Sequence, residues 1–152
     1  VYSGGFILGD EGSAAALGKL FIADFLKGLV PEDIAEEFAA KYDSDYATII
    51  QYVYRSQTSP SGYLGNFAPF IMEHYENPYI SKLVEGNFRS FIRRSLKQFD
   101  TERYSVGVVG GFGYALKDIF TKVAEEEGVK ISRFIKEPID GLVAYHLEGR
   151  DK

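Results

Sequence analysis

The stretch Ser105-Val-Gly-Val-Val-Gly-Gly-Phe-Gly113, together with the residues that follow it, decides the fold of this chain. Residues 105–109 form a short, valine-rich segment that ends at the glycine pair 110–111. This pattern is typical of a buried strand. An amphipathic pattern over 114–127 predicts a helix capped by Gly128, and 129–135 has the pattern of a second strand. A connection this short between two strands is typical of a parallel pair with a right-handed crossover. The sequence therefore predicts the α/β class.

Helical periodicity dominates the residues that precede this segment. The expected helices cover residues 13–27, 31–42, 45–54, 67–74 and 80–99. The apolar residues expected to face the core from the first of them are Leu17, Leu20, Phe21 and Phe25. The longest helix carries one apolar stripe from Ile80 to Phe99, as a helix packed on one side does. These helices predict a helical layer inserted between the opening segment and the sheet.

Proline and glycine mark the remaining boundaries. Gly28 is expected to end the first helix, and Pro31 to open the second. Pro60 and Gly62 predict a loop over 56–65. Pro138 predicts a last helix that runs through Leu142 and Tyr145.

Composition limits the class of protein. The 152 residues are 45% hydrophobic and 26% charged, which fits one folded domain. The net charge of −5 argues against a nucleic-acid partner, and no apolar run approaches the roughly 20 residues that cross a membrane. The absence of cysteine excludes disulfides, iron–sulfur clusters and thiolate zinc sites within the chain. No signal peptide is visible, and a cytoplasmic location is expected.

Two glycine loops stand where a ligand could bind. In Gly9-Asp10-Glu11-Gly12-Ser13, two carboxylates lie between glycines, where an apolar and supposedly extended segment (6–8) meets a helix. Asp10 could accept hydrogen bonds from a sugar hydroxyl or hold a hydrated Mg²⁺ ion, and Glu11 could do the same. Simple capping of the helix by Asp10 or Ser13 is the alternative, but it does not explain the flanking glycines.

The second loop, 110–113, allows a ligand to approach the backbone at the end of the first strand. In open α/β sheets, ligands bind outside the carboxyl ends of the strands. A tight strand-to-helix turn would explain the glycines equally well. No Lys-Ser/Thr pair follows, so this is not a phosphate loop of the Walker type, and Leu116 stands where a dinucleotide fingerprint has its third glycine.

Other polar groups favour a plainer interpretation. Arg89, Arg93, Arg94 and Lys97 could bind an anion, but a solvated helix face with acidic neighbours explains them better. His74 and His146 are too few for a histidine metal site and are expected to be packed or on the surface.

These residues carry a family resemblance. The run Gly5-Phe-Ile-Leu-Gly-Asp-Glu-Gly-Ser13 resembles the Gly-Asp-Glu-Gly-Ser signature of the N-acetylglucosamine kinase and BadF/BadG/BcrA/BcrD ATPase family, part of the actin-like, hexokinase and Hsp70 ATPase superfamily. Residues 66–70 are similar to a Phe-Ala-containing helix of that family, and 106–115 to its adenosine motif. Pro138-Ile-Asp-Gly141 is similar to its last glycine turn.

The resemblance implies a two-lobed kinase that closes on ATP and an amino sugar. This chain would be the C-terminal, ribonuclease H-like lobe, with 1–12 as hinge and substrate loop, 13–100 as helical insertion and 104–148 as the adenosine-binding part. Gly5 and Asp10 would line the sugar pocket. The residues that would flank the adenosine are Ala68, Gly110, Gly111 and Ala115.

Two family parts are absent from these residues: the Asp-Gly-Gly-Gly-Thr phosphate loop and the aspartate that deprotonates the sugar hydroxyl. The resemblance therefore implies no catalytic residue and no metal ligand here, a missing N-terminal lobe as partner, ATP and Mg²⁺ as cofactors, and an inactive isolated chain. The start at Val1, without methionine, also indicates a cut inside a larger protein. The resemblance leaves a homodimer open.

Two alternatives remain. One is a BadF-type ATPase that couples ATP hydrolysis to electron transfer, against which the lack of cysteine ligands speaks. The other is a non-catalytic domain that senses a sugar or nucleotide through the same loops. The retained glycines at both loops favour the kinase.

Overall fold

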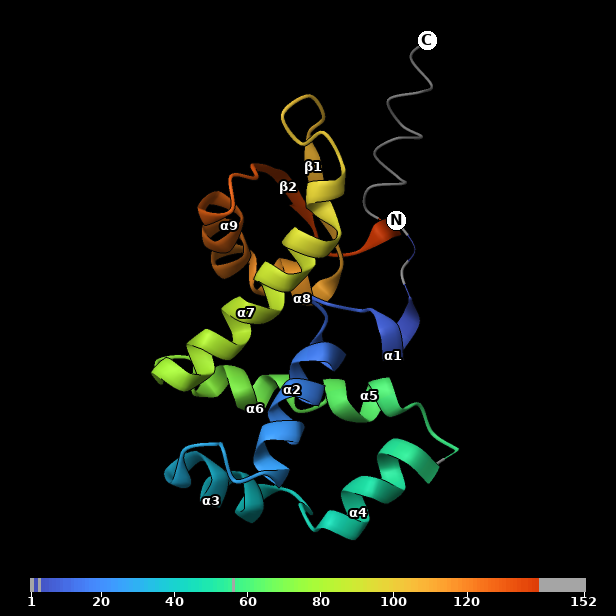
Figure 1. Ribbon diagram of the computed structural model, residues 1–152, viewed down its shortest axis with the longest axis vertical. Coiled ribbons are helices and arrows are strands. Elements are labelled where there is room, and N and C mark those ends of the chain that lie inside the picture. Colours follow the sequence, from blue (N-terminus) through green and yellow to red (C-terminus); the bar gives the residue numbers. More distant parts are fainter. Residues whose placement is uncertain (1, 3, 56, 140–152) are drawn as a thin grey trace. The chain divides into compact units, whose positions relative to one another are not determined.

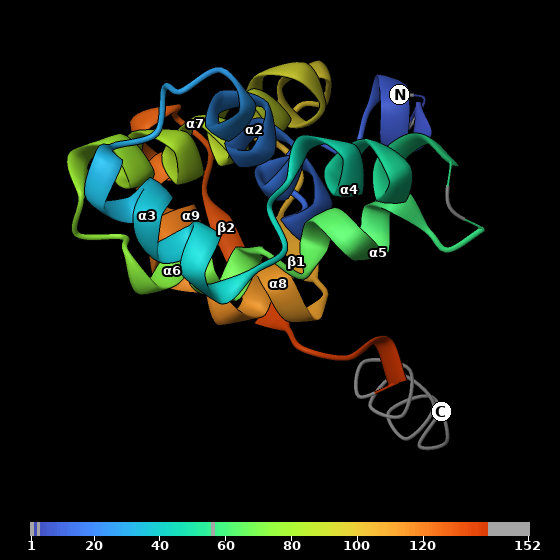
Figure 2. The ribbon, with the colours of Figure 1, turned by 90° about the horizontal axis from the view of Figure 1, so that it is seen from below.

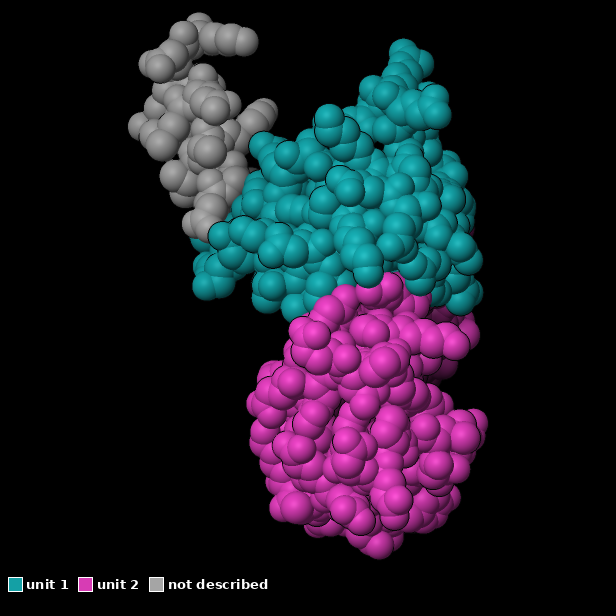
Figure 3. All heavy atoms as spheres, turned by 90° about the vertical axis from the view of Figure 1, so that its left-hand side faces the viewer, with its two compact units in different colours: residues 1, 88–152 teal, residues 2–87 magenta. Residues whose placement is uncertain are grey.

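A computed structural model describes residues 2, 4–55 and 57–139 of the chain (Figure 1). The chain divides into two compact units (Figure 3). The first along the chain, residues 2–87, is magenta and is unit 2 in the key, and the second, residues 88–152 together with residue 1, is teal and is unit 1 in the key. The boundary falls inside helix α7 (Pro78–Arg94), which contributes its first ten residues to the first unit and the rest to the second. The expected last helix from Pro138, His146 and the turn at Gly141 lie largely or wholly outside the described residues.

The described part of the first unit is helical (Figures 1 and 2). Its elements before α7 are α1 (Gly5–Leu8), α2 (Ala14–Leu26), α3 (Glu32–Lys41), α4 (Tyr46–Ile50), the π-helix η1 (Gln51–Arg55), α5 (Pro60–Gly65) and α6 (Ala68–Glu73). The expected helices over 13–27, 31–42, 45–54 and 67–74 are thus confirmed, the third continuing as a π turn.

The core of this unit is an aromatic cluster centred on Phe38. This side chain is 1% exposed and lies in ring contact with Phe21 at 5.1 Å and with Phe70 at 5.3 Å. Phe25, Tyr42 and Phe67 complete the cluster. Burying each such side chain contributes about 1.5–3 kcal/mol, and edge-to-face pairs add to that. These aromatic side chains therefore hold α2, α3 and α6 together.

Helix α2 begins and ends as its sequence predicts. The Ser13 hydroxyl accepts a hydrogen bond from the Ala16 amide at 3.0 Å, and Gly28 takes the left-handed φ of 67° that a helix end favours. One expectation is wrong: Leu20 is 39% exposed, and Ile22, 4% exposed, points inward instead. The cause is that α2 is covered on the side of Leu17, Gly18, Phe21 and Ile22.

The expected loop over 56–65 is also wrong, because residues 60–65 form α5. Pro60 stands in the first turn, where its missing N–H does not matter, and the Ser59 hydroxyl accepts from the Gly62 amide. Serine followed by proline is a helix-start signal, and it outweighs the glycine that suggested a loop.

Helix α5 crosses α2 at close range because α2 has no side chain at the crossing. A Cβ atom on Gly18 would overlap the carbonyl oxygen of Leu64 in α5. Backbone approach of this kind requires glycine. Gly18 therefore sets the distance between the two helices.

Helix α7 carries the predicted apolar stripe, but with different bounds. It begins at Pro78 and ends at Arg94, after which η2 (Leu96–Gln98) is a 3₁₀ turn. Ile80, Val84 and Phe88 are at most 1% exposed, whereas Phe99 is 59% exposed and lies beyond the helix. The stripe therefore predicts the buried face correctly and the end of the helix wrongly.

The second unit contains a two-stranded parallel sheet. Its remaining elements are β1 (Val106–Val109), α8 (Gly111–Ala115), α9 (Lys117–Glu126) and β2 (Ile131–Ile135). Strand β1 pairs with β2 in parallel, from Val106 opposite Ile131 to Val109 opposite Ile135, which confirms the predicted pairing. The α/β class is thus observed as helices with a small parallel sheet.

Three details of this unit differ from expectation. Val109 is 54% exposed and β1 has no fully buried residue, so it is not a buried strand. Two strands cover too little of each other to bury a valine run on both faces. The expected helix over 114–127 begins earlier, at Gly111, and is broken at Leu116. Gly128 caps α9 at φ 75° as predicted.

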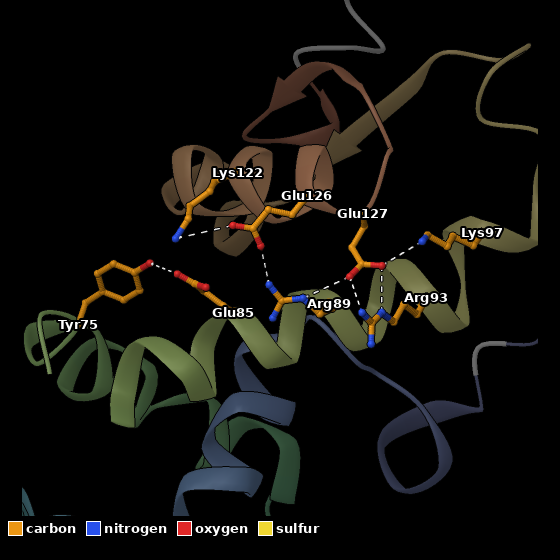
Figure 4. Close-up of polar contacts among 8 residues, drawn as sticks. All are labelled: Tyr75, Glu85, Arg89, Arg93, Lys97, Lys122, Glu126 and Glu127. Atoms are coloured by element: carbon orange, nitrogen blue, oxygen red, sulfur yellow. Dashed lines mark hydrogen bonds and ion pairs between the residues drawn. The ribbon is translucent and has the colours of Figure 1, made fainter. Parts of the chain in front are cut away.

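A charged cluster joins α7 to the end of α9 within the second unit (Figure 4). Glu127 is 7% exposed at its side chain, and its carboxylate contacts Arg93 at 2.7 Å and Lys97 at 2.9 Å. Arg89 contacts both Glu127, at 3.3 Å, and Glu126, at 2.6 Å. The basic face of α7 is therefore paired with acidic neighbours, as the plainer interpretation expects.

The segment before the first glycine loop is not extended. Residues Gly5–Leu8 form the single turn α1, with Ile7 and Leu8 about four-fifths exposed. A strand needs a neighbour for its backbone groups, and among the described residues the sheet contains only β1 and β2.

No helix in the described part of the chain is long and apolar enough to cross a membrane.

Candidate functional site

The first glycine loop is a tight turn with a strained aspartate. Asp10 has a φ of 62° and is the one non-glycine among the described residues with a positive φ. The Ser13 amide donates to the Asp10 carbonyl oxygen at 3.1 Å, and Gly12 between them has a φ of 82°. A left-handed aspartate costs about 1 kcal/mol relative to an ordinary conformation. The strained residue is therefore Asp10, the one that the family resemblance places in the sugar pocket.

The Asp10 side chain is not used by the helix that follows. Ser13 caps α2, so the alternative in which Asp10 is the cap is wrong. Within the described residues, the Asp10 carboxylate has no hydrogen bond or ion pair, and the residue is partly exposed. A carboxylate in this state is free to accept hydrogen bonds from a ligand.

Gly5 lies close to this loop through the backbone. The Gly9 amide donates to the Gly5 carbonyl oxygen at 2.8 Å and so closes α1. Gly5 has a φ of 63°, and a Cβ there would meet nothing within 4 Å. Lys19 holds the same turn from α2, with its Nζ 3.4 Å from the Phe6 carbonyl oxygen. The structure thus brings Gly5 and Asp10 together within the first unit.

Asn87 is a residue of this loop that sequence reasoning missed. Its side-chain Oδ1 accepts from the Gly12 amide at 2.9 Å, and its Nδ2 donates to the Ser13 carbonyl oxygen at 3.0 Å. The residue is 3% exposed and lies on the apolar face of α7, seven residues after Ile80. A polar residue within a buried stripe is the signal that could have identified it.

The second glycine loop leaves open space above the backbone of the second unit. Gly110 has a φ of 132°, which only glycine adopts easily, and a Cβ on Gly110 or Gly111 would meet nothing within 4 Å. Gly113, in contrast, packs α8 on β1, since a Cβ there would lie 2.8 Å from Val108 Cγ1. Ala115 ends α8 and is exposed. Gly110, Gly111 and Ala115 therefore belong to one short strand-to-helix segment.

Ala68 belongs to the first unit, with Gly5 and Asp10. It is the first residue of α6 and is 5% exposed. The six residues assigned from the resemblance thus fall into two groups, three in each unit.

The groups with shifted pKa values stabilise helices elsewhere. Burial and a hydrogen bond to Asp24 raise the pKa of Tyr79 far above its ordinary value, and burial raises that of Tyr63. The hydrogen bonds from Arg93 and Lys97 lower the pKa of Glu127 to about 2. Among the described residues, no three His, Asp or Glu side chains lie together as a metal site would need.

Comparison with known proteins agrees with the family resemblance. A solved structure from Porphyromonas gingivalis, provisionally named an N-acetylglucosamine kinase, matches 96% of this chain with a TM-score of 0.90 and 34% sequence identity. The chain resembles an N-acetylglucosamine kinase. It spans about half of that protein, 51% of its length. No protein-family model and no curated protein matches the sequence.

Proposed function

We propose that this chain is the C-terminal lobe of an ATP-dependent amino-sugar kinase of the actin-like ATPase superfamily. The observation that carries the proposal is the match to the N-acetylglucosamine kinase structure, at 34% identity over 96% of the chain. The match covers about half of that protein, so a second lobe would complete the enzyme. Because such an enzyme draws on cellular ATP, we place it in the cytoplasm.

In the proposed reaction, a sugar hydroxyl oxygen forms a bond to the γ-phosphorus of ATP while the bond to the bridging oxygen of ADP breaks. The hydroxyl proton passes to a base that we place in the other lobe, since we assign none of the described residues as the base. Mg²⁺ would neutralise the charge on the phosphates. The described residues offer no cluster of three carboxylate or imidazole ligands, so we assign none of them to the metal.

Asp10 supports the sugar-binding part of the proposal. Its carboxylate has no partner among the described residues, and the turn holds it in a left-handed conformation. Carboxylates commonly accept hydrogen bonds from hydroxyl groups, and strained residues cluster at ligand sites. Gly5, one hydrogen bond away from the same loop, would allow the sugar to approach the backbone.

The test of this part is Asp10→Asn in the full-length protein. Asparagine tolerates the left-handed conformation and has the same size, so the loop is kept and only the charge is lost. We expect the Kd for glucosamine or N-acetylglucosamine to rise by about 10–100-fold, as the loss of a hydrogen bond to a charged group does. Unchanged sugar affinity would remove Asp10 from the site.

The open backbone at Gly110 and Gly111 supports the nucleotide-binding part. In open α/β sheets, ligands lie at the carboxyl end of the strands, which is where β1 meets these glycines. Gly111→Ala tests it cleanly, because the φ of Gly111 is not positive and the added methyl group points into open space. We expect the fold to tolerate the change and the Kd for Mg-ATP to rise on the order of tenfold.

Gly86→Ala is the matched control for this experiment. Gly86 is also helical, exposed and without a neighbour within 4 Å of an added Cβ. Calorimetry with Mg-ATP should show the wild-type Kd for Gly86→Ala and a higher one for Gly111→Ala. Equal affinities in all three proteins would count against a nucleotide at this loop.

The same titrations distinguish the alternatives. Sugar binding without nucleotide binding in the full-length protein would favour a sensor domain. An iron–sulfur absorption spectrum would favour a BadF-type electron-transfer ATPase. We expect residues 1–152 alone to consume no ATP in response to sugar, because they contain neither the phosphate loop nor the catalytic aspartate of the family.

A further inference from the structure

Asn87 occupies a position that an apolar residue would fill in an ordinary amphipathic helix. Val84 and Phe88, which flank it on the buried face of α7, are each 1% exposed. Asn87 is the one polar residue among the buried side chains of the described residues. Removing an amide from water is unfavourable unless its donor and acceptor are both paired. The reason for an asparagine here must therefore lie in its partners.

Both partners, Gly12 and Ser13, belong to the first glycine loop, residues 9–13. The Gly12 amide lies outside α2, so no helical carbonyl is available to it, and Asn87 Oδ1 accepts its hydrogen bond at 2.9 Å. The Ser13 carbonyl oxygen receives the Leu17 amide at 3.1 Å within the helix and Asn87 Nδ2 at 3.0 Å from the side. The side-chain amide of Asn87 thus binds the backbone of two consecutive residues of the turn, on either side of the Gly12–Ser13 peptide bond.

The two hydrogen bonds of Asn87 also constrain Asp10, because Asp10, Gly12 and Ser13 belong to the same turn. The Ser13 amide closes the turn onto the Asp10 carbonyl oxygen, so fixing Gly12 and Ser13 fixes the residue that has the strained φ of 62°. A strained residue persists only where its surroundings determine it. Three hydrogen bonds tie Gly12 and Ser13 to Asp10 and to α7, and Asn87 supplies two of them.

We propose that Asn87 is the positioning residue of the sugar loop, which holds the Asp10 carboxylate where a sugar hydroxyl can donate to it. The proposal rests on the proposed function, since it assumes that Asp10 binds the sugar. Asn87 touches no substrate and acts only through Gly12 and Ser13. Its loss should weaken the binding of the amino sugar and leave the binding of Mg-ATP unchanged.

Asn87→Asp in the full-length protein separates the two hydrogen bonds. A carboxylate still accepts from the Gly12 amide but cannot donate to the Ser13 carbonyl oxygen, and it repels that oxygen. When protonated, the same side chain regains a donor. Burial raises the pKa of the introduced carboxyl group and the hydrogen bond from the Gly12 amide lowers it, and we expect burial to dominate. The ratio of variant to wild-type Kd for the sugar should therefore grow as pH rises from 5.5 to 8.5, reaching on the order of 10–100-fold.

Asn77→Asp, at the residue that immediately precedes the same helix, is the matched control. Asn77 Oδ1 accepts from the Tyr79 amide at 2.9 Å before α7 begins, and an aspartate keeps that bond. This variant should bind the sugar as the wild type does at every pH. A ratio for Asn87→Asp that stays at one throughout, or one that Asn77→Asp reproduces, would overturn the positioning role.

A second variant keeps the proposal testable apart from the function. Asn87→Ser is too short to reach both peptide groups, so the Gly12 amide should exchange its hydrogen much faster than in the wild type while the thermal midpoint confirms folding. Equal exchange rates of the Gly12 amide in the variant and the wild type would refute the support of this turn by Asn87. If the wild type binds no amino sugar, the proposed function and the sugar role of Asn87 fall together, whereas slow Gly12 exchange that depends on Asn87 would still stand.

Discussion

Replacing Gly18 by alanine should destabilise the protein, although helix propensity alone predicts the opposite. Alanine is favoured over glycine inside a helix by about 1 kcal/mol. At Gly18, however, the new Cβ would overlap the Leu64 carbonyl oxygen, which is backbone and cannot rotate away. Overpacking of this kind costs about 1–3 kcal/mol, and a contact with backbone belongs at the upper end. We expect a net loss of about 2 kcal/mol.

Gly86→Ala provides the opposite sign in the same assay. Gly86 lies inside α7, and an added Cβ meets nothing within 4 Å, so only the propensity gain of about 1 kcal/mol remains. At about 2–4 °C per kcal/mol, thermal unfolding followed by circular dichroism should place Gly18→Ala roughly 4–8 °C below the wild type and Gly86→Ala roughly 2–4 °C above it. A Gly18→Ala protein as stable as Gly86→Ala would refute the close crossing of α2 and α5.

Two further predictions concern buried or paired polar groups. In Glu127→Gln the ion pairs with Arg93 and Lys97 are lost. Since the folded pKa of Glu127 is lowered from 4.5 to about 2, its contribution is present above pH 4.5 and disappears as pH falls towards 2. Urea midpoints should therefore differ between wild type and variant at pH 7 and converge near pH 2, and a gap independent of pH would contradict this. Tyr79→Phe removes the 2.8 Å hydrogen bond to Asp24 and should lower the free energy of unfolding by about 1–2 kcal/mol, with Tyr54→Phe, at a residue 77% exposed, as a neutral control.

Local signals in the sequence predict most of the fold. The left-handed glycines at 28 and 128 lie where expected, because each depends on a few neighbouring residues, and Ser13 is one of the two caps that the sequence allows. The errors occur where distant contacts decide. Leu20 has the spacing of a core residue but lies on the uncovered side of α2, and Phe99 continues the stripe beyond the end of its helix. The π turn after α4 had no signal that we recognised.

Part of the candidate site could also be predicted. The turns at Gly9 and Gly110 have the residue types that positive φ requires, and the structure shows such values at Asp10, Gly12 and Gly110. The sequence does not reveal which groups form hydrogen bonds with the backbone and side chains of each turn. Whether Asp10 caps the helix or remains free depends on Ser13 and on the exact path of the backbone, which the residue types alone leave open.

Asn87 shows why a site can be partly visible and still be missed. Its position on the apolar face of α7 is evident from the spacing of Ile80, Val84 and Phe88, and a polar residue there must find partners. The partners, Gly12 and Ser13, are 75 and 74 residues away, and nothing local in either segment points to the other. A buried polar residue in an apolar stripe can therefore be read as evidence that a distant backbone turn needs support. Glycine-containing loops, where the backbone has least support of its own, are the first places to look for that turn.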